Sequence, residues 1–547
     1  MLSPDYLAHI PDVACALWQQ VEEDILADIA RRLAKMGEAT DTALWQVKRL
    51  EQVRLFRSDV VRRLKKASGQ SEALIRQLLQ LACTQALQAD DAAHEAAGQT
   101  VSAMNDSSAL RNLLTAGAKQ TNGTMANITA TTANTATGQF ERALDRAWLQ
   151  TTSGAFDYKT AVRRCVADLA STGLEAVRYP SGHVDTLEVA VRRAVVTGVN
   201  QSACRLQMER CKEVECDLVE VTAHVGARPS HAQWQGKIYS ISGKHSKYPP
   251  LSETGYGTGA GLGGWNCRHN MFPFWEGISG PQYTPQRLAE LDAKDIEYKG
   301  KQYSRYEINQ MQRSRERRVR RWKRQYAMEE AAGLDSTQTA VWLKKARVDL
   351  EHFTRDTGGR VDSARVGVHG FGPSQAIKAT NSAIRQHSAW MKSIGAENSE
   401  LTALAKYYEA KYNKSPDYEL LRGYVNAVKA GNISPLVGID VYEDVAKRIT
   451  DTLIGVTTPH GTTIQSFATH FIDRVIGQTS TSHAGMRQGV NILDVKDALE
   501  NPVREGAVEY FAGGDIRQTL YGKKVAVSYS IRDKRLIQTN PRRGDSV

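Results

Sequence analysis

The sequence predicts a mainly α-helical protein with α+β parts, and three observations lead to this expectation. Apolar residues recur at helical spacing through most of the first hundred residues, short strands follow after about residue 215, and alternating strands return near the end. A chain of 547 residues is too long for one ordinary domain, so we expect two to four domains. The predicted parts are a helical N-terminal region, a mixed α+β domain, a helical linker and a small α+β domain with an antiparallel sheet, over residues 1–150, 151–372, 373–450 and 451–547.

The composition favours a protein of a reducing compartment that meets an anionic partner. The formal net charge is +11, which favours nucleic acid, an acidic protein surface or a membrane surface without choosing among them. Seven cysteines with no Cys-x-x-Cys pair do not indicate a disulfide framework in a chain of this length. The first residues lack a basic stretch before an apolar run, and no run of about eighteen apolar residues follows. We therefore expect neither a signal peptide nor a membrane segment.

Residues 4–98 are predicted to form helices whose apolar residues serve packing. The first long helix carries an apolar stripe at helical spacing, made of Trp18, Val21, Ile25, Ile29, Leu33 and Met36. The pattern continues through residues 39–53 and again through 68–87, where the opening "SGQ" suggests a Ser or Gly cap. By contrast, residues 117–138 are small and polar, which predicts a loop, a weak helix or a flexible connection.

In the middle of the chain the helical period gives way to strands. Helices are expected over about 139–212, and residues 216–224 and 237–241 are predicted to be short strands. A Gly-rich loop then covers residues 242–264 and contains a formal G-x-G-x-x-G at Gly259, Gly261 and Gly264. No strand precedes these glycines and no helix follows them, so a dinucleotide-binding turn is excluded. A tightly turning loop is the better interpretation.

The middle region also concentrates histidine, cysteine and tryptophan. A tetrahedral zinc set could in principle come from His231, His245, Cys267 and His269. Only two positions separate the last pair, no second close pair completes a standard zinc finger, and three more cysteines are similarly dispersed, namely Cys204, Cys211 and Cys216. We therefore expect no metal and no cofactor. The favoured alternative is a compact core that is packed and hydrogen-bonded by Trp234, Trp265, Asn266 and His269.

A nucleophilic pair of Cys267 and His231 is a weaker alternative. A reactive thiol needs a lowered pKa, and no recognisable helix start lies beside this cysteine to lower it.

Two helices are expected after the middle region, over residues 306–330 and 338–354. The segment 312–324, "QRSRERRVRRWKR", carries eight basic residues in thirteen. Cations on nearly every face of a helix cannot all serve a core. The segment is therefore expected to lie in solvent, against an acidic protein surface or against phosphates.

The last hundred residues combine a helix with strands. The helix of "ATHFIDRVIGQ" places His470 and Arg474 one turn apart on one face. The segment 523–531 alternates as a strand, residues 532–534 are a plausible turn, and 535–540 form a final strand. Residues 523–543 contain seven Lys or Arg and one acidic residue, and this local excess of positive charge favours binding to an RNA backbone.

Metal-free RNA cleavage needs groups that transfer protons and cations that stabilise charge on phosphorus. His470 suits the proton transfer, and Arg474 could hold the phosphate with its planar fork. The alternative is that His470 is a capped or partly buried helix residue and Arg474 a salt-bridge partner.

The middle of the chain resembles the tailed-phage minor capsid protein 2 family, which is related to Mu F-type head morphogenesis proteins. The resemblance rests on "VTAHVGARPSHAQWQGKIYSISG", "GYGTGAGLGGWNCRHNMFPFWEG", "YEINQMQRSRERRVRRWKR" and "RVGVHGFG". It implies a virion protein present in few copies near the portal and head interior, with no enzyme activity in residues 1–372. The recurring motif residues map to Arg228, His231, Trp234, Gly236, Asn266, Cys267, Arg268 and His269, for which the resemblance implies a structural role.

Residues 462–541 are similar to phage-encoded members of the barnase–EndoU–colicin–RelE-like nuclease superfamily. The pattern is the early helical His and Arg, then "GVNILDVKDALENP", a glycine before a basic strand, and the closing "IQTNP". Carried over by position, the resemblance implies catalytic roles for His470, Arg474 and Thr539. It implies substrate-binding roles for Lys523 and Lys524.

Two functional hypotheses follow from these features. One is a minor capsid protein whose C-terminal domain is a metal-independent ribonuclease. The other is a purely structural capsid protein with an inactive or interaction domain at that end. The expected partners are portal or other capsid proteins, packaged DNA through residues 312–324, and RNA. The expected locations are the phage head, and the host cytoplasm during assembly or after delivery.

Overall fold

The computed structural model describes residues 1–37, 41–478, 487–511 and 513–542. The chain divides into two compact units, Met1–Lys378 and Ala379–Val547. Each unit has its own hydrophobic core. The fold is mainly α with α+β parts, which confirms the predicted class, whereas the four-part subdivision stays a prediction.

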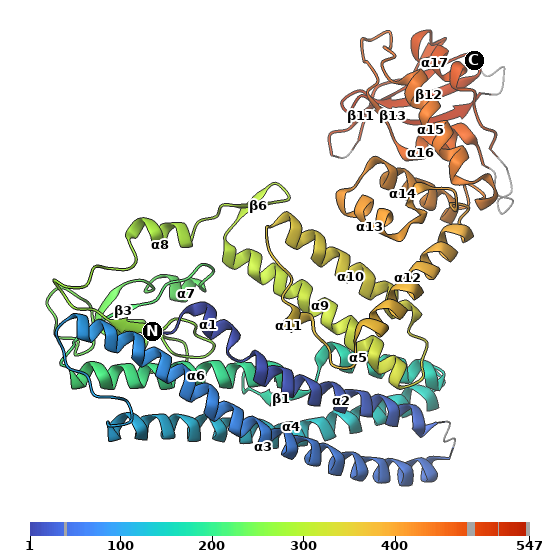
Figure 1. Cartoon of the computed structure of the whole chain (residues 1–547). Helices are drawn as coiled ribbons and strands as arrows, with labels where there is room; N and C mark the ends of the chain where they lie inside the picture. The colour runs from blue at the N-terminus through green and yellow to red at the C-terminus, as the bar shows by residue number, and fades with distance from the viewer. Residues whose placement is uncertain (38–40, 479–486, 512, 543–547) are drawn as a thin grey trace. The chain divides into compact units, whose positions relative to one another are not determined.

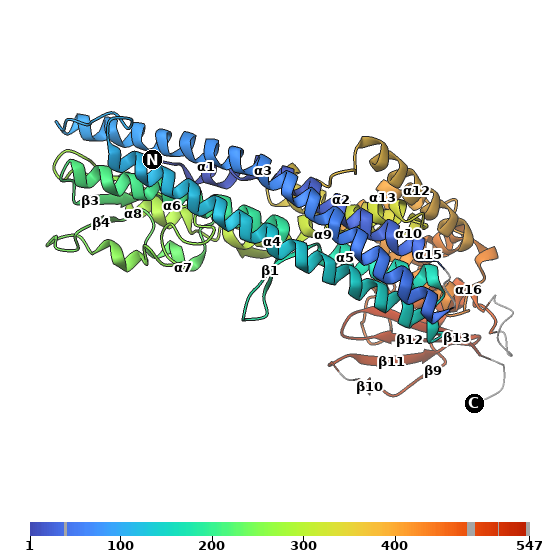
Figure 2. The same ribbon diagram turned by 90° about the horizontal axis from the view of Figure 1, so that it is seen from below.

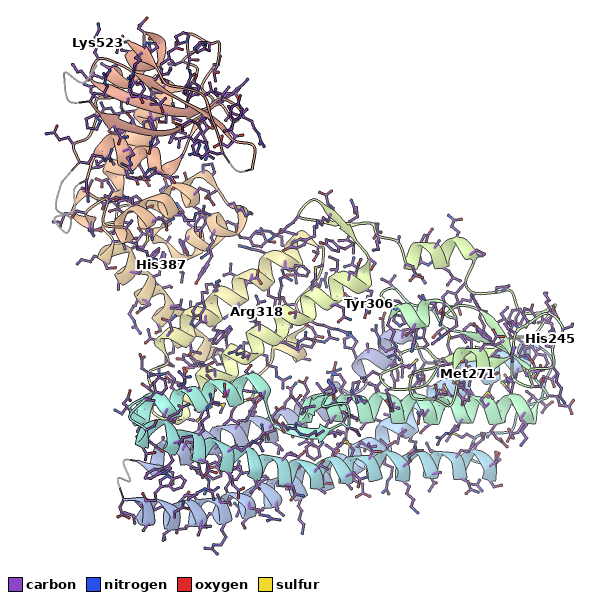
Figure 3. All side chains as sticks on the ribbon, turned by 180° about the vertical axis from the view of Figure 1, so that it is seen from behind. His245, Met271, Tyr306, Arg318, His387 and Lys523 are labelled. Carbon is purple, nitrogen blue, oxygen red and sulfur yellow. The ribbon has the colours of Figure 1, made fainter. Side chains whose placement is uncertain are left out.

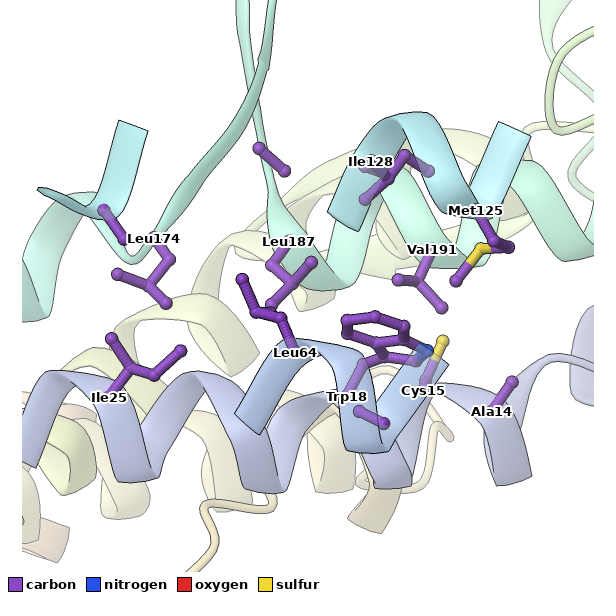
Figure 4. Close-up of a cluster of buried hydrophobic side chains, with 14 of the residues drawn as sticks. Ala14, Cys15, Trp18, Ile25, Leu64, Met125, Ile128, Leu174, Leu187 and Val191 are labelled. Carbon is purple, nitrogen blue, oxygen red and sulfur yellow. The ribbon is translucent and has the colours of Figure 1, made fainter. Parts of the chain in front are cut away.

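The first unit is built on long helices that lie side by side (Figures 1 and 2). Their bounds are α1 (Pro4–His9), α2 (Asp12–Met36), α3 (Thr42–Ala96), α4 (Ser108–Thr152), α5 (Tyr158–Thr172) and α6 (Leu187–Glu213). The predicted apolar stripe of α2 is a packing surface. Trp18 and Ile25 are fully buried and lie among Leu64 of α3 and Leu187 and Val191 of α6 (Figure 4). Removing this much apolar surface from water stabilises the bundle.

One helix of this unit differs from the expectation, and another decides between alternatives that the sequence left open. The predicted cap at "SGQ" is wrong, because α3 continues through Ser68 and Gly69 as one helix of 55 residues. Its apolar stripe continues across this point and packs on α4 and α6, which offsets the weak helix propensity of a single glycine. For residues 117–138, the helical alternative is correct, because they form the middle of α4.

Small residues allow α4 and α6 to pack closely. A Cβ atom on Gly117 would lie 2.2 Å from Oγ of Ser202, and one on Gly198 would lie 2.2 Å from Oγ1 of Thr121. The Thr121 hydroxyl donates to the carbonyl of Gly117 at 2.8 Å, so the polar group is satisfied within its own helix. The composition that suggested a flexible segment therefore belongs to a tight helix contact.

The mixed region follows α6 and carries short strands, as predicted. Its elements are β3 (Leu218–Val221), α7 (Pro229–Ala232), β4 (Ile238–Ser240), the 3-10 turn η1 (Leu251–Thr254), β5 (Met271–Pro273), α8 (Pro285–Leu291), β6 (Ile296–Tyr298) and β7 (Lys301–Tyr303). Strands β1 (Glu175–Arg178) and β2 (Val184–Thr186) pair antiparallel between α5 and α6, so the helical expectation for residues 139–212 is wrong at this point. Strands β4, β3 and β5 form an antiparallel sheet in that order. This sheet holds the loops that carry the histidine and cysteine motifs.

The first unit ends with α9 (Arg305–Ala331), α10 (Thr337–Asp356) and α11 (Ser363–Val366). Helix α9 starts with a capping box in which Ser304 and Glu307 each bond the other's backbone N–H. It packs on α10, α5 and α2, so the basic segment lies inside the unit along much of its length.

The second unit combines helices with a sheet. Its elements are α12 (Pro373–Ser393, which begins before the unit boundary), η2 (Glu400–Thr402), α13 (Leu404–Asn413), α14 (Pro416–Lys429), η3 (Pro435–Val437), α15 (Ile439–Leu453), β8 (Ser466–Phe467), α16 (Thr469–Ile476), α17 (Ile492–Glu500), β9 (Arg504–Glu505), β10 (Glu509–Tyr510), β11 (Ile516–Tyr521), β12 (Val525–Ser530) and β13 (Arg535–Pro541).

Within the described residues the sheet order is β10, β11, β12, β13 and β8, and β9 also pairs with β11. All of these pairs are antiparallel except β13 with β8. Helix α16 packs on β13 and α17 packs on β12. The predicted strands in residues 523–540, and the turn between them, are confirmed. Among the described residues, no helix is both long and apolar enough to cross a membrane.

Candidate functional site

In the second unit, α16 holds His470 in a chain of side-chain hydrogen bonds. Nδ1 of His470 lies 3.1 Å from Oδ2 of Asp473, and Nε of Arg474 donates to Nε2 of His470 at 3.0 Å. A carboxylate only accepts and a guanidinium only donates, so Nδ1 carries the ring proton and Nε2 holds a lone pair. The His470 side chain is 43% exposed, so solvent or a ligand can reach it.

Asp473 is the member of this chain that the sequence prediction missed. Its carboxylate is buried and also accepts a hydrogen bond from the Tyr442 hydroxyl at 3.2 Å. Burial and the neighbouring Asp473 carboxylate raise the pKa of Tyr442 well above its usual range. An acid three positions after a histidine on one helix is a sequence signal that could have identified this pair.

The end of α16 meets the end of β13. Nη1 of Arg474 lies 3.5 Å from Oδ1 of Asn540. Arg487 donates to the carbonyls of Arg474 at 3.1 Å and of Thr539 at 3.3 Å. Burial and the positive charge of Arg474 lower the pKa of Arg487. The helix and the last strand, nearly seventy residues apart in sequence, therefore contribute to one small region of the surface.

Thr539 lies in this region, but its hydroxyl does not face outward. The residue is fully buried, and Oγ1 donates to the carbonyl of Ala526 on β12 at 3.0 Å. The hydroxyl thus forms a hydrogen bond between two strands of the sheet. The side chain that reaches Arg474 is that of the neighbouring Asn540. The Thr539 hydroxyl, which was expected to donate to a phosphate oxygen, therefore already donates to the Ala526 carbonyl.

Lys523 and Lys524 lie in the turn between β11 and β12 (Figure 3 labels Lys523). Nζ of Lys524 is 3.4 Å from Asp494, and its side chain is still 73% exposed. Ala526 pairs with Asn540, so this turn lies at the same end of the sheet as Arg474. Several cations thus gather at one sheet end, which suits a polyanion.

A second constellation lies in the mixed region of the first unit. His231 comes from α7, and Cys267 and His269 from the segment just before β5. The two Nδ1 atoms are 3.3 Å apart, and Sγ of Cys267 is 3.7 Å from each. All three side chains are buried, and their nitrogen and sulfur atoms form a group that could hold a metal ion. Of the residues considered for zinc, these three come together, whereas His245 lies instead beside Glu276 at 3.6 Å.

Burial shifts the pKa values of these three side chains toward their neutral forms. Burial lowers the pKa of His231 to about 4 and that of His269 well below its usual value. Burial also raises the pKa of the Cys267 thiol. A nucleophilic cysteine needs a lowered thiol pKa, so this buried environment does not favour a Cys267–His231 nucleophilic pair, although the two atoms are 3.7 Å apart.

Some of the other motif residues pack around this group, and some do not. The Trp234 ring is buried 4.4 Å from the His231 ring and 4.8 Å from the His269 ring. Gly236 has a positive φ of 64°, and a Cβ there would lie 2.5 Å from Leu288. The expected core role of Trp265 and Asn266 is wrong, because both are exposed, Trp265 by 59%. Asn266 has a φ of 55°, which places it in the turn that follows the Gly-rich loop.

The Gly-rich loop folds back on itself beside this group. A Cβ on Gly261 would lie 2.1 Å from the carbonyl oxygen of Gly255, and one on Gly264 would lie 2.4 Å from that of Gly259. The glycines therefore permit backbone-to-backbone contact, which agrees with the interpretation as a tightly turning loop. The loop places the carbonyl of Ala260 2.9 Å from Nε2 of His231.

Next to the two histidines lies a cavity of about 390 Å³. Its lining includes His224, Asn309 and the acids Glu188 and Glu316. The arginines that line it are Arg192, Arg228, Arg268, Arg313, Arg317, Arg320 and Arg365. Burial, then the nearby Arg365 and Arg268, lower the pKa of Arg313 to about 10. The cavity is therefore strongly cationic.

The basic segment of α9 is partly an internal ion-pair network, which the sequence did not predict. Arg324 is buried, with Nη2 2.7 Å from Glu23 and 3.2 Å from Glu22 of α2. Arg320 is also buried and pairs with Glu188 of α6. The expectation was that such cations cannot all serve a core; these two do, because buried carboxylates face them, while others on the same helix stay exposed. The exposed cations on α9 include Arg317 and Arg318, the latter labelled in Figure 3.

Comparisons with known proteins agree with the resemblance of the middle of the chain to phage minor capsid proteins, and the matching family model does not extend to residues 462–541. Two structural proteins of phages are similar to this chain. The protein of Lactococcus phage LL-H is 29% identical over 206 residues, which cover 37% of this chain and 53% of the relative. The protein of Lactococcus phage mv4 is 39% identical over 87 residues, which cover 16% of this chain and 62% of the relative. The match thus spans between half and two thirds of each relative. No solved structure matches the chain.

The model of the family described as phage minor capsid protein 2 matches residues 2–355. This segment contains the helical bundle, the histidine and cysteine group and helices α9 and most of α10. Because it is well over half of the sequence, the chain belongs to the phage minor capsid protein 2 family.

Proposed function

We propose that this minor capsid protein lies near the portal and head interior and carries a metal-independent RNA-cleaving site in its second unit. Family membership supports the virion role and other capsid proteins as partners. The observation that carries the nuclease proposal is the hydrogen-bonded chain from Asp473 through His470 to Arg474 at a cationic end of the sheet. During assembly or after delivery, the host cytoplasm would offer RNA as substrate.

The chemistry follows from the hydrogen-bond directions. Asp473 holds Nδ1–H, so Nε2 of His470 is the basic atom. RNA phosphate would draw the Arg474 guanidinium away from Nε2 and onto its oxygens. The 2′-oxygen then attacks phosphorus, its proton passes to Nε2, the bond to the 5′-oxygen breaks, and that oxygen takes a proton from water. The products are a 2′,3′-cyclic phosphate and a 5′-hydroxyl.

The test uses the purified full chain and a fluorescent single-stranded RNA in EDTA. His470→Ala should lower cleavage by about 10² to 10⁴, the usual contribution of a positioned proton-transfer group. Arg474→Lys should retain part of the rate that Arg474→Ala loses. His460→Ala is the matched control, because His460 is an exposed histidine of the same unit that pairs with Glu505 instead. Cleavage that survives His470→Ala would refute this mechanism.

A second candidate, an interaction domain without catalysis, is favoured by the apolar edge of the same sheet. Tyr510 of the edge strand β10 is 80% exposed, and the following Phe511 is 42% exposed. Exposed aromatic residues on an edge strand are typical of a surface that another chain covers. Wild-type chain that cuts none of the RNAs offered, together with loss of virion incorporation in Tyr510→Ser, would favour this function over the nuclease.

A further inference from the structure

We propose that His231, Cys267 and His269 bind one zinc ion through their Nδ1, Sγ and Nδ1 atoms, with a fourth coordination position open to the cationic cavity. The three atoms lie within 4.8 Å of one another and belong to buried side chains. This inference is independent of the nuclease proposal, because it concerns the first unit.

The distances between the three atoms match the edges of a tetrahedron around zinc. With Zn–N of about 2.05 Å and Zn–S of about 2.3 Å, ideal edges are about 3.35 Å between nitrogens and about 3.55 Å between sulfur and nitrogen. The observed N–N separation is 3.3 Å and both S–N separations are 3.7 Å. One ion can therefore reach all three atoms without rearrangement of the backbone.

The outer nitrogens of both rings fix the tautomers that metal binding requires. Nε2 of His231 faces the carbonyl of Ala260 at 2.9 Å, so it must donate. Nε2 of His269 faces Oε1 of Gln235 at 3.1 Å. This amide orientation is set by the backbone, because the N–H of residue 224 also donates to Oε1. Both Nε2 atoms therefore carry the protons, as they do in metal-bound histidines with an outer hydrogen-bond acceptor.

As a consequence, both Nδ1 atoms present lone pairs to one another at 3.3 Å. Two acceptors at hydrogen-bond distance repel unless a cation or a proton lies between them. The single S–H of Cys267 can satisfy one of them at most. A metal ion satisfies both nitrogens and the thiolate together, which no single proton can do.

The donor set selects the ion. One thiolate with two imidazoles suits zinc, whereas Mg²⁺ and Ca²⁺ prefer oxygen ligands. Three protein ligands leave one of four tetrahedral positions for an exchangeable group. His231 and His269 line the cavity, and so do Arg228 and Arg268, so the exchangeable group is water or an anion held by the arginines.

The ligands are widely spaced in the sequence. His231 and Cys267 are thirty-six positions apart, and the Gly-rich loop within that stretch brings the two together. The spacing of a zinc finger does not apply to a site assembled across a folded loop.

The first test measures metal in the full chain purified without chelator. Inductively coupled plasma mass spectrometry should find one zinc per chain, and Cys267→Ser should lower this at least tenfold. Cys211→Ser is the matched control, because Cys211 is a buried cysteine of the same region outside the group, and it should retain full zinc. Wild-type chain that stays free of zinc when supplied with equimolar zinc sulfate would overturn the proposal.

The second test separates metal binding from folding. Gln235→Leu keeps all three ligands but removes the acceptor for His269, and it should weaken zinc affinity by about 10-fold to 100-fold. Cobalt(II) chloride added to the chelator-treated chain should give tetrahedral visible bands and a near-ultraviolet sulfur-to-metal band that Cys267→Ser abolishes. Retention of that band in Cys267→Ser would overturn the ligand assignment. Inorganic phosphate should shift the visible bands, and unchanged bands would overturn the binding of an anion at the fourth position.

Discussion

Replacing Arg324 with methionine should destabilise the first unit by about 3 to 5 kcal/mol, because it leaves two buried carboxylates with only the more distant guanidinium of Arg320, 3.7 Å from Glu22 and 3.9 Å from Glu23. Glu22 is fully buried and Glu23 is 6% exposed, and the Arg324 guanidinium contacts both. Burial lowers the pKa of Arg324, but the two carboxylates more than offset this and raise it, so the arginine stays charged. The network joins α9 to α2.

The expected shift in melting temperature follows from the size of the unit. An unfolding entropy of about 2.1 cal/mol/K per residue gives about 0.8 kcal/mol/K for the residues up to Lys378, so the loss corresponds to about 5 °C. Differential scanning calorimetry would measure it. Arg317→Met is the control, because Arg317 is an exposed cation of the same helix, and it should shift the melting temperature by less than about 1 °C.

A rescue variant makes the reasoning falsifiable in a second way. Adding Glu22→Gln and Glu23→Gln to Arg324→Met removes the two weakly paired charges while Arg320 keeps Glu188 as its partner, and it should restore more than half of the lost stability. Equal melting temperatures for Arg324→Met and Arg317→Met would refute the internal role of the arginine. No recovery in the triple variant would refute the charge argument.

Gly117→Ala should destabilise the first unit by about 1 to 3 kcal/mol because its Cβ would collide with α6, whereas Gly123→Ala in the same helix meets open space and should be neutral or stabilising; urea unfolding compares them. If α9 contacts packaged DNA through its exposed cations, Arg317→Gln with Arg318→Gln should reduce the slope of log affinity against log salt by about two. An unchanged slope would show that these two arginines do not contact DNA. Burial lowers the pKa of His387, so below about pH 6.5 the unfolded state binds a proton that the folded state does not. The stability of the second unit should therefore fall as pH falls, and His387→Gln should flatten the dependence in urea titrations.

Periodic patterns predicted much of the fold. The stripe that includes Trp18 and Ile25 is buried, and the strands over residues 523–540 are present, because a helical or alternating period directly records which face is buried. Helix length was harder to predict. Gly69 weakens the helix locally, but the packing of α3 on its neighbours is strong enough to keep the helix continuous through this residue. A local sequence pattern does not show which helices will pack on it.

Sites assembled from distant segments were only partly predictable. The sequence identified His470 and Arg474 because one helix turn relates them, but it could not show that Thr539 would bond Ala526 across the sheet. The charge density of α9 was visible, whereas the carboxylates that neutralise Arg324 come from a helix about three hundred residues earlier in the chain. Tertiary contacts of this kind leave no spacing rule in the sequence.

Quantitative mass spectrometry of purified DNA-filled particles of the encoding phage would show whether this chain is a virion protein. We expect peptides from both units, residues 1–378 and 379–547, in equal and low copy per particle, because one capsid chain carries both units into the virion. Particles that contain no peptides of this chain would contradict the structural role. Particles that retain only peptides of residues 1–378 would contradict the proposal that the second unit travels with the capsid.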